Sequence, residues 1–256
     1  MVQIHPKEDG HRPTNFLDGT AASPLPKAQS ARIQNHRSIL DCRHPTRRCH
    51  HRHPQSSITP MSQAIIPILG AGESGIGAAR LALRHGLSPW VSDRGVIAPN
   101  RVDELNALNI DFESGQHDVK RILEAGKASG FVIKSPGIPD QTDLIRTLRD
   151  ASIEVISEIE FAARYACTAD QQIVAITGAN GKTTTTALVA AILQDAGCDV
   201  ACVGNIGTSW ARDLADREQP ARFQVVEVSS FQLDGTVTFQ PDIAILLNIT
   251  PDHLDR

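Results

Sequence analysis

Cysteine is scarce in this sequence, and its five cysteines follow no pattern. They lie at positions 42, 49, 167, 198 and 202, without the even count and regular spacing of a disulfide framework. Long apolar runs are also missing, so no segment is long enough to cross a bilayer. The N-terminus lacks the apolar core of a secretory signal. We therefore expect a soluble, cytoplasmic protein without disulfides.

Sustained apolar periodicity is absent from the first sixty residues, which carry nine Lys or Arg, four Asp or Glu and seven of the ten histidines. We expect residues 1–60 to be disordered, or to be a non-native extension ahead of a natural start at Met61. Zinc binding by "CRHPTRRCHHRHPQSS" is a weaker interpretation, because no regular zinc-ligand pair lies within a hydrophobic mini-core. Nucleic-acid contact is also weaker, because no aromatics or helical face organise the basic residues.

From Ile65 onwards, short β-rich runs alternate with helical stretches, which is typical of parallel sheets covered by helices. The first series predicts strands at 65–69, 89–93, 130–134 and 154–157, and helices near 75–86, 99–108, 118–126, 141–150 and 158–168. The second predicts strands near 173–177, 200–204, 223–229 and 243–248, and helices at 182–196 and 208–216. The sequence therefore predicts an α/β protein with two nucleotide-binding-type domains in tandem, residues 61–168 and 169–256, with a boundary near 168–172.

A short glycine loop opens the second domain in "IVAITGANGKTTTTALVAAILQDAG", residues 173–197. The regular P-loop G-x-x-x-x-G-K-[ST] does not match, because Ile176 holds the place of its first glycine. The physical requirements are still present: backbone N–H groups and a helix N-terminus for a phosphate, Lys182 as a point charge, and the Thr183 hydroxyl for magnesium. The alternative to a phosphate-binding loop is an ordinary strand-to-helix turn without a ligand. We predict that nucleotide phosphates bind to Gly178, Ala179, Asn180, Gly181, Lys182, Thr183 and Thr184.

A second glycine pattern, "ILGAGESGIGAAR", opens the first domain. Gly70, Gly72 and Gly75 form G-x-G-x-x-G between a strand and a helix, and Asp93 ends the next strand. This arrangement normally holds a dinucleotide, whose pyrophosphate approaches the glycines while the acid takes a ribose hydroxyl. Any nucleotide diphosphate offers the same charge, however, and glycines also permit close packing of a strand against a helix. The pattern alone leaves these three interpretations open.

Several stretches together resemble the Mur ligases in order and spacing. They are "ILGAGESGIGAA", "KSPGIP" (134–139), "VISEIEFA" (155–162), "ITGANGKTTTT" (176–186), "VGNIG" (203–207), "VEVSSFQLD" (226–234) and "LLNITPDHLDR" (246–256). The resemblance spans residues 64–256. Within the family, "SSFQLD" and "NITPDHLDR" are most similar to the member that adds D-glutamate to UDP-N-acetylmuramoyl-L-alanine.

The resemblance implies a fold and a reaction. Mur ligases have a Rossmann-like UDP-binding domain, a central P-loop-type ATPase domain with a short "GTNGKT" loop, and a C-terminal domain that closes over the nucleotide. With ATP and Mg²⁺ they convert a substrate carboxylate to an acyl phosphate, from which the incoming amine displaces phosphate during peptidoglycan precursor synthesis. The implied partners are UDP-N-acetylmuramoyl-L-alanine and D-glutamate; no nucleic acid, membrane or protein partner is implied.

The resemblance also implies roles for individual residues. The catalytic set is Lys182, Glu227 and His253, and the metal ligands are Thr183, Glu227 and His253. The UDP-linked substrate is expected to contact Gly70, Gly72, Glu73, Ser74, Gly75, Asp93, Arg94, Ser135, Asn205, Ser229 and Ser230. Bland alternatives are a solvated edge acid for Glu227, a surface histidine for His253, and simple turn punctuation for the Pro-Gly turn that follows Ser135.

Two departures from the family pattern stand out. Ala179 replaces the usual threonine of the loop, which should matter little because the loop works through its backbone N–H groups. The sequence ends at Arg256, inside the central domain by this alignment, so we expect the chain alone to lack the closing domain and the carbamylated lysine that holds a second magnesium, and to be inactive.

Two other classes of function compete with a ligase. An NAD-dependent dehydrogenase would use the Gly70–Gly75 loop and Asp93 but would not need the Lys182 loop. A P-loop regulatory ATPase would use Lys182 but not the first glycine pattern. A ligase that joins a UDP-bearing substrate in an ATP-driven step uses both patterns.

Overall fold

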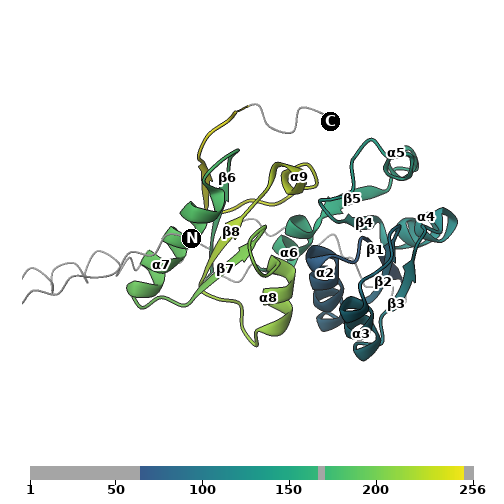
Figure 1. Cartoon of the computed structure of the whole chain (residues 1–256), viewed down its shortest axis with the longest axis horizontal. Helices are drawn as coiled ribbons and strands as arrows, with labels where there is room; N and C mark the ends of the chain where they lie inside the picture. Colours follow the sequence, from purple (N-terminus) through teal and green to yellow (C-terminus); the bar gives the residue numbers. More distant parts are fainter. Residues whose placement is uncertain (1–63, 167–170, 251–256) are drawn as a thin grey trace, which may run out of the picture. The chain divides into compact units, whose positions relative to one another are not determined.

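The computed structural model describes residues 64–166 and 171–250, which all lie within one compact unit of the chain (Figure 1). These residues form two parallel β-sheets with helices packed against them, so the predicted α/β class is confirmed. No described helix is long and apolar enough to span a membrane.

The first sheet contains five strands in the order β3-β2-β1-β4-β5, and every neighbouring pair is parallel. Its strands are β1 (Ile65–Leu69), β2 (Ser88–Asp93), β3 (Asp111–Ser114), β4 (Phe131–Lys134) and β5 (Glu154–Ser157). The accompanying helices are α2 (Glu73–Arg84), α3 (Pro99–Ala107), α4 (Val119–Ser129), α5 (Asp143–Asp150) and α6 (Glu158–Ala166). Because the strand order reverses at β1, the crevice outside the carboxyl ends of β1 and β4 is where such a sheet binds ligands.

The second sheet contains four described strands in the order β7-β8-β6-β9, again all parallel. Its strands are β6 (Gln172–Thr177), β7 (Val200–Gly204), β8 (Phe223–Glu227) and β9 (Ile243–Leu246). Its helices are α7 (Lys182–Asp195), α8 (Trp210–Asp216) and α9 (Ser230–Leu233). β6 lies between β8 and β9, so the loop that follows it emerges at the corresponding switch point of this sheet.

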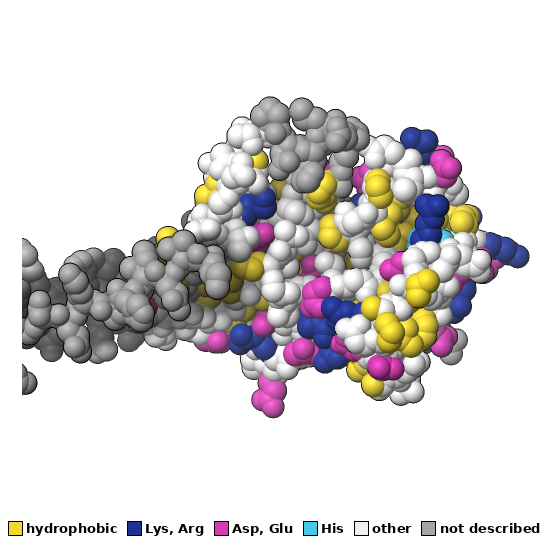
Figure 2. Space-filling view, viewed as in Figure 1, with side chains coloured by type: hydrophobic (Ala, Val, Ile, Leu, Met, Phe, Trp, Pro, Cys, Tyr) yellow, Lys and Arg dark blue, Asp and Glu magenta, His cyan; other side chains and the backbone are white. Residues whose placement is uncertain are grey.

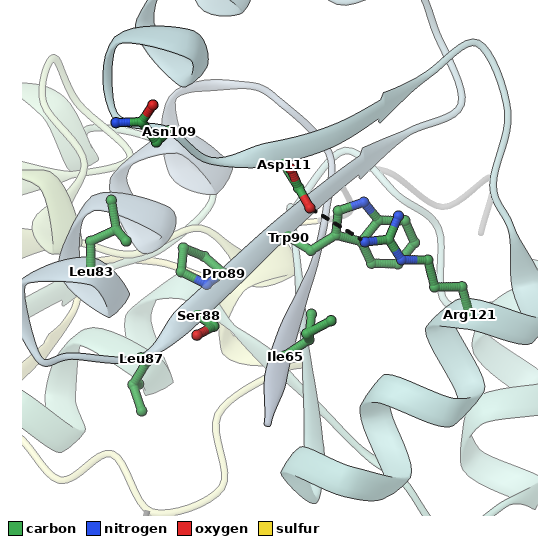
Figure 3. Close-up of a pocket in the computed structure, with 9 residues that line it drawn as sticks. All are labelled: Ile65, Leu83, Leu87, Ser88, Pro89, Trp90, Asn109, Asp111 and Arg121. Atoms are coloured by element: carbon green, nitrogen blue, oxygen red, sulfur yellow. Dashed lines mark ion pairs between the residues drawn. The ribbon is translucent and has the colours of Figure 1, made fainter. Parts of the chain in front are cut away.

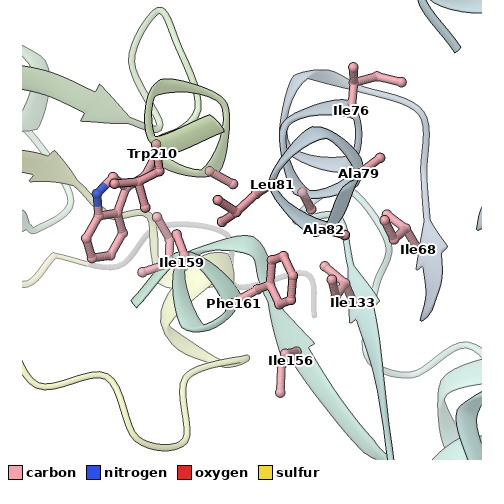
Figure 4. Close-up of a cluster of buried hydrophobic side chains, with 14 of the residues drawn as sticks. Ile68, Ile76, Ala79, Leu81, Ala82, Ile133, Ile156, Ile159, Phe161 and Trp210 are labelled. Carbon is pink, nitrogen blue, oxygen red and sulfur yellow. The ribbon is translucent and has the colours of Figure 1, made fainter. Parts of the chain in front are cut away.

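The largest apolar cluster is shared by the two sheets. It joins Ile68 and Ile133 of the first sheet to Val203 and Val226 of the second, through α2, α6 and α8. Figure 4 shows side chains of these three helices meeting, with Phe161 and Trp210 among them. A separate cluster under α4 and α5 covers the other face of the first sheet, and a third under α7 covers the other face of the second.

The sequence-based prediction omits two elements. Strand β3, "DFES", lies at the sheet edge with Asp111 exposed, so it lacks the buried apolar run by which the other strands were predicted. Helix α9 has only four residues, but it begins with a capping box in which Ser229 and Gln232 satisfy each other's backbone N–H groups. The predicted domain boundary includes residues 168–170, which lie outside the described ranges, so it stays a prediction.

Candidate functional site

The loop after β6 has the strand, loop and helix arrangement that the sequence predicts. Gly178 and Gly181 have φ of +146° and +83°, which side chains other than glycine rarely adopt. Helix α7 begins directly afterwards at Lys182, whose Nζ donates to the carbonyls of Gly178 at 2.7 Å and Ala179 at 2.9 Å. The ammonium group is therefore held over the loop, and Thr183 and Thr184 are exposed in the first turn of the helix.

Asn248, just beyond β9, braces this loop. Its backbone carbonyl accepts from Ala179 N at 3.2 Å, its Oδ1 accepts from Asn180 N at 2.9 Å, and its Nδ2 donates to Asn180 O at 2.9 Å. Asn248 was not among the predicted site residues, although its position at the end of a predicted strand was a usable signal. Two of the N–H groups predicted to bind phosphate thus hold the loop closed onto Asn248 in this structure.

Glu227 ends β8 beside the same loop, opposite Ile176 in the strand register. The residue is only 2% exposed. Its Oε1 accepts from Asn205 Nδ2 at 3.1 Å, while its buried Oε2 has no hydrogen-bond partner among the described residues. A buried carboxylate oxygen without a partner is costly unless a cation neutralises it. The alternative of a solvated edge acid is therefore wrong.

The surroundings of Glu227 fit a magnesium ion that is held partly by phosphate oxygens. Mg²⁺ prefers oxygen ligands and is commonly bound by one or two protein groups together with substrate phosphates. The described residues contain no group of three or more His, Cys, Asp or Glu that could hold a metal alone. Glu227 and the hydroxyl of Thr183 are the candidate ligands on this chain, and the third predicted ligand, His253, lies outside the described residues.

In the glycine loop of the first sheet, Gly75 is needed for packing, whereas Gly72 faces open space. A Cβ on Gly75 would overlap the carbonyl of Gly70, so this glycine is required for close packing, whereas a Cβ on Gly72 would meet nothing within 4 Å. Asp93 Oδ2 accepts from Ala71 N at 2.7 Å and its Oδ1 accepts from Gly95 N at 2.8 Å. Asp93 therefore fixes the shape of the loop, and the open space at Gly72 is where a ligand could approach the N-terminus of α2.

Glu73, the first residue of α2, links α2 to α3 and α8. Its carboxylate accepts from Arg101 at 2.8 Å and Arg212 at 2.7 Å, and Ser209 Oγ donates to its backbone carbonyl at 3.3 Å. Burial raises the pKa of Glu73, but the hydrogen bond from Arg101 and the charge of Arg212 outweigh burial and hold it below its usual value. Figure 2 shows basic and acidic side chains interspersed where α8 faces α2 and α3.

The other predicted contacts with the UDP-linked substrate are less closely grouped. Ser135 packs against Gly70, with its Oγ 3.5 Å from the Gly70 carbonyl. Ser229 caps α9 and Ser230 is exposed beside it. Arg94 is exposed in the turn after β2, and Ser74 is half-buried at the start of α2. The structure thus gives Ser229 a structural task, and its role in substrate binding stays a prediction.

A cavity of about 250 Å³ lies at the opposite, amino-terminal end of the first sheet. Arg121 stacks over the Trp90 ring there at 4.1 Å and pairs with Asp111 at 3.8 Å, as Figure 3 shows. Parallel sheets bind ligands at their carboxyl edge. This cavity is therefore separate from the candidate site.

Comparison with known proteins finds similar sequences for both sheets. Residues 64–157 match the sequence model described as Mur ligase MurD-like, N-terminal domain, and residues 176–256 match that of the Mur ligase middle domain. A UDP-N-acetylmuramoylalanine--D-glutamate ligase of Porphyromonas gingivalis is 52% identical over 191 residues, which cover 75% of this chain and 40% of that protein. The enzyme of the same name from Cytophaga hutchinsonii is 48% identical over 196 residues, covering 77% of this chain and 42% of that one.

The chain thus spans about two fifths of the length of these curated relatives. Among solved structures, the UDP-N-acetylmuramate:L-alanyl-gamma-D-glutamyl-meso-diaminopimelate ligase from Neisseria meningitides has a TM-score of 0.50 at 22% identity. That match covers 75% of this chain and 63% of the other, and it shows a shared fold.

Proposed function

The chain belongs to the Mur ligase family, and we propose on this basis that it carries the nucleotide sites of an ATP-dependent ligase that adds D-glutamate to UDP-N-acetylmuramoyl-L-alanine. The reaction would use ATP and Mg²⁺, activate the substrate carboxylate as an acyl phosphate, and belong to peptidoglycan precursor synthesis in the cytoplasm. The relatives support neither a dehydrogenase nor a regulatory ATPase.

The buried Oε2 of Glu227 lies beside the Lys182 loop and has no hydrogen-bond partner among the described residues, and this observation carries the proposal. A magnesium ion bound there would neutralise charge on the nucleotide phosphates. Lys182 adds a positive charge at the start of α7, and Asn205 fixes the orientation of the Glu227 carboxylate. Because phosphoryl transfer depends mainly on alignment and charge neutralisation, these groups are of the kind that the reaction requires from a protein.

The first sheet would hold the UDP end of the substrate. Its open glycine, Gly72, precedes the N-terminus of α2, which favours an anion through its free N–H groups and helix dipole. Asn205 lies in the loop after β7, and Ser209 follows it as the cap of α8 in contact with Glu73 of α2. The segment from Asn205 to Ser209 thus contacts Glu227 of β8 at one end and Glu73 of α2 at the other.

Ligand-dependent melting of the chain, followed by circular dichroism, tests the proposal. UDP-N-acetylmuramoyl-L-alanine and MgATP are each expected to raise the melting temperature by several degrees at about 100 times their Kd, because both bind the folded state. NADH is expected to leave it unchanged. Stabilisation by NADH with no response to the muramoyl nucleotide would overturn the ligase assignment.

A Glu227→Gln substitution tests the metal site separately. It keeps the acceptor for Asn205 but removes the charge, so the additional stabilisation that Mg²⁺ gives to ATP binding should disappear while the response to the UDP-linked substrate is retained. Glu124→Gln, on the exposed side of α4, is the matched control and should behave as the unaltered chain does. An undiminished Mg²⁺ effect in Glu227→Gln would remove this carboxylate from the site.

A further inference from the structure

A partly buried hydrogen-bonded relay lies at the carboxyl edge of the first sheet. Ser92, in β2, faces Glu113 of β3 in the strand register and is completely buried. Its hydroxyl donates to Glu113 Oε2 at 3.0 Å and lies 2.7 Å from His117 Nδ1. His117 is half-buried in the turn before α4, two residues ahead of its start at Val119.

The relay determines which nitrogen of His117 carries the proton. An ionised carboxylate only accepts hydrogen bonds, so the single hydroxyl proton of Ser92 is directed to Glu113. The Ser92 oxygen is then an acceptor, and His117 Nδ1 must be the donor to it. In the neutral ring this leaves Nε2 as an acceptor with a free lone pair. No described residue makes a hydrogen bond to Nε2.

The backbone ties this histidine to the glycine loop. Gly70 N donates to Ser92 O at 2.8 Å, and Gly115 N donates to both Asp93 O and Gly95 O at 3.0 Å. His117 therefore lies beside the end of β2, where the acid of a nucleotide-binding sheet meets the ribose. Here both oxygens of Asp93 already accept from backbone N–H groups, at Ala71 and Gly95. His117 would therefore offer a ligand hydroxyl a second acceptor at this edge, beside the Asp93 carboxylate that holds the loop.

We propose that His117 is a specificity-determining residue for the nucleotide, whose Nε2 accepts a hydrogen bond from a ribose hydroxyl while Ser92 and Glu113 hold the ring in the required tautomer. This inference rests on the proposed function and deepens it, because it assigns the recognition of the sugar to a residue outside the predicted site. A histidine that only supports the turn would need the Nδ1 contact alone. Nε2 has no hydrogen-bond partner among the described residues and is not one of their buried unpartnered atoms, so it faces solvent with a fixed orientation and is open to a ligand hydroxyl.

The ionisation of the ring agrees with this assignment. Burial is the main reason that the pKa of His117 lies below its usual 6.5; the carboxylates of Asp93 and Glu113 oppose the shift, and Arg94 adds to it. The ring is thus neutral at pH 7 and above, and Nε2 is an acceptor there. Protonation at lower pH would turn Nε2 into a donor, which cannot accept the proton of a hydroxyl group.

The test compares UDP with 2′-deoxy-UDP and 3′-deoxy-UDP by titration calorimetry. In the unaltered chain one deoxy analogue should bind about two- to tenfold more weakly than UDP, which is the usual net worth of one hydrogen bond. His117→Asn can still donate to Ser92 but has no atom in place of Nε2, so it should bind UDP as weakly as that analogue. His117→Gln supplies an acceptor farther along the side chain and should recover part of the difference.

The outcomes separate this inference from the proposed function. If the unaltered chain binds UDP and His117→Asn keeps the same ratio of UDP to deoxy-UDP affinity, His117 has a structural role only and the inference is wrong. If the unaltered chain binds no UDP, the proposed function fails as well. Circular dichroism of each variant establishes that the fold is retained.

A pH series supplies a second readout. UDP-N-acetylmuramoyl-L-alanine is the suitable ligand, because its pyrophosphate is a diester without the secondary ionisation of UDP near pH 6. Its affinity for the unaltered chain should be constant above neutral pH and fall as the pH drops below the pKa of His117. The same series on His117→Gln should lack this fall. An identical fall in both proteins contradicts the proposal.

Discussion

Glu158 is a residue whose environment makes the stability of the protein depend on pH. It is completely buried at the start of α6, and its Oε1 accepts from Ala211 N at 2.5 Å, while its Oε2 has no hydrogen-bond partner among the described residues. Burial raises the pKa of Glu158 from 4.5 to about 7; the Ala211 N–H opposes this rise and the charge of Glu73 adds to it. The folded protein therefore favours the protonated, neutral carboxyl group.

The sign of the pH effect follows from this direction. Because the folded pKa is above the unfolded one, the stabilisation from this group is complete below pH 4.5 and is lost as the pH rises through about 7. Glu158→Gln keeps the acceptor and cannot ionise, so it should unfold at a higher denaturant concentration than the unaltered chain at pH 8. The gain should reach the order of 3 kcal/mol there and nearly vanish at pH 4. An equal gain from Glu158→Gln at both pH values would contradict this account.

Residues of the candidate site differ in how far the sequence could reveal them. Lys182 and the glycines belong to contiguous patterns, and Glu227 ends an apolar strand, so each was predictable from its neighbours in the chain. The position of Asn248 at the end of a predicted strand was a usable signal, but its partner Ala179, like the pairing of Ser92 with His117, is set only when distant segments meet. Single-sequence patterns do not identify such partners.

At the scale of elements, the contact between α2 and α8 depends on a glycine. A Cβ on Gly77 would overlap Ser209 Oγ and lie 3.0 Å from Arg212 N. In an exposed helix, Gly→Ala usually stabilises by about 1 kcal/mol. Here Gly77→Ala should instead lower the free energy of unfolding by about 1–3 kcal/mol, because the helices must separate or repack.

A double-mutant cycle in urea checks this expectation. Ser209→Ala alone removes the cap of α8 and should cost about 1 kcal/mol. It also removes the hydroxyl that the methyl group introduced by Gly77→Ala would overlap, so the double variant should cost less than the two single variants together. Additive losses would show that the contact between α2 and α8 does not depend on the absence of a side chain at Gly77.

The elements themselves were largely predictable where burial and periodicity agree. The long, amphipathic helices and the buried strands follow from apolar patterning, with ends displaced by a few residues. Strand β3 was not predicted because an edge strand needs only one covered face and one partner, here β2, and therefore has a weak apolar pattern. The local sequence of α9 contained its capping box, but a single helical turn gives no periodic pattern by which to recognise it.

At the scale of the whole described structure, the shared apolar cluster should make the two sheets unfold together. Buried residues of both sheets contact one helical layer formed by α2, α6 and α8, and Arg84 of α2 donates to the carbonyls of Leu214, Ala215 and Glu218 at and beyond the end of α8. Separation of the sheets would expose this cluster and leave those ionic and polar groups without partners.

Calorimetry tests this coupling. We expect one thermal transition for residues 64–250, with equal calorimetric and van't Hoff enthalpies. Arg212→Ala removes the ion pairs with Glu73 and Glu104 and should lower the temperature of that transition without splitting it. Two resolved transitions in the unaltered chain would mean that each sheet is stable without the other.

The placement of the two tryptophans has an optical consequence. Trp90 belongs to the first sheet, beneath the guanidinium of Arg121 and with its buried indole N–H unpartnered among the described residues. Trp210 lies in α8 within the shared cluster, where its N–H donates to Gln224 and its ring meets Phe239 edge-on. Each indole therefore has a distinct electronic environment, so its emission wavelength can be assigned by replacing the other with phenylalanine. The Trp90→Phe protein then has a single tryptophan, which lies in the apolar cluster shared by the two sheets.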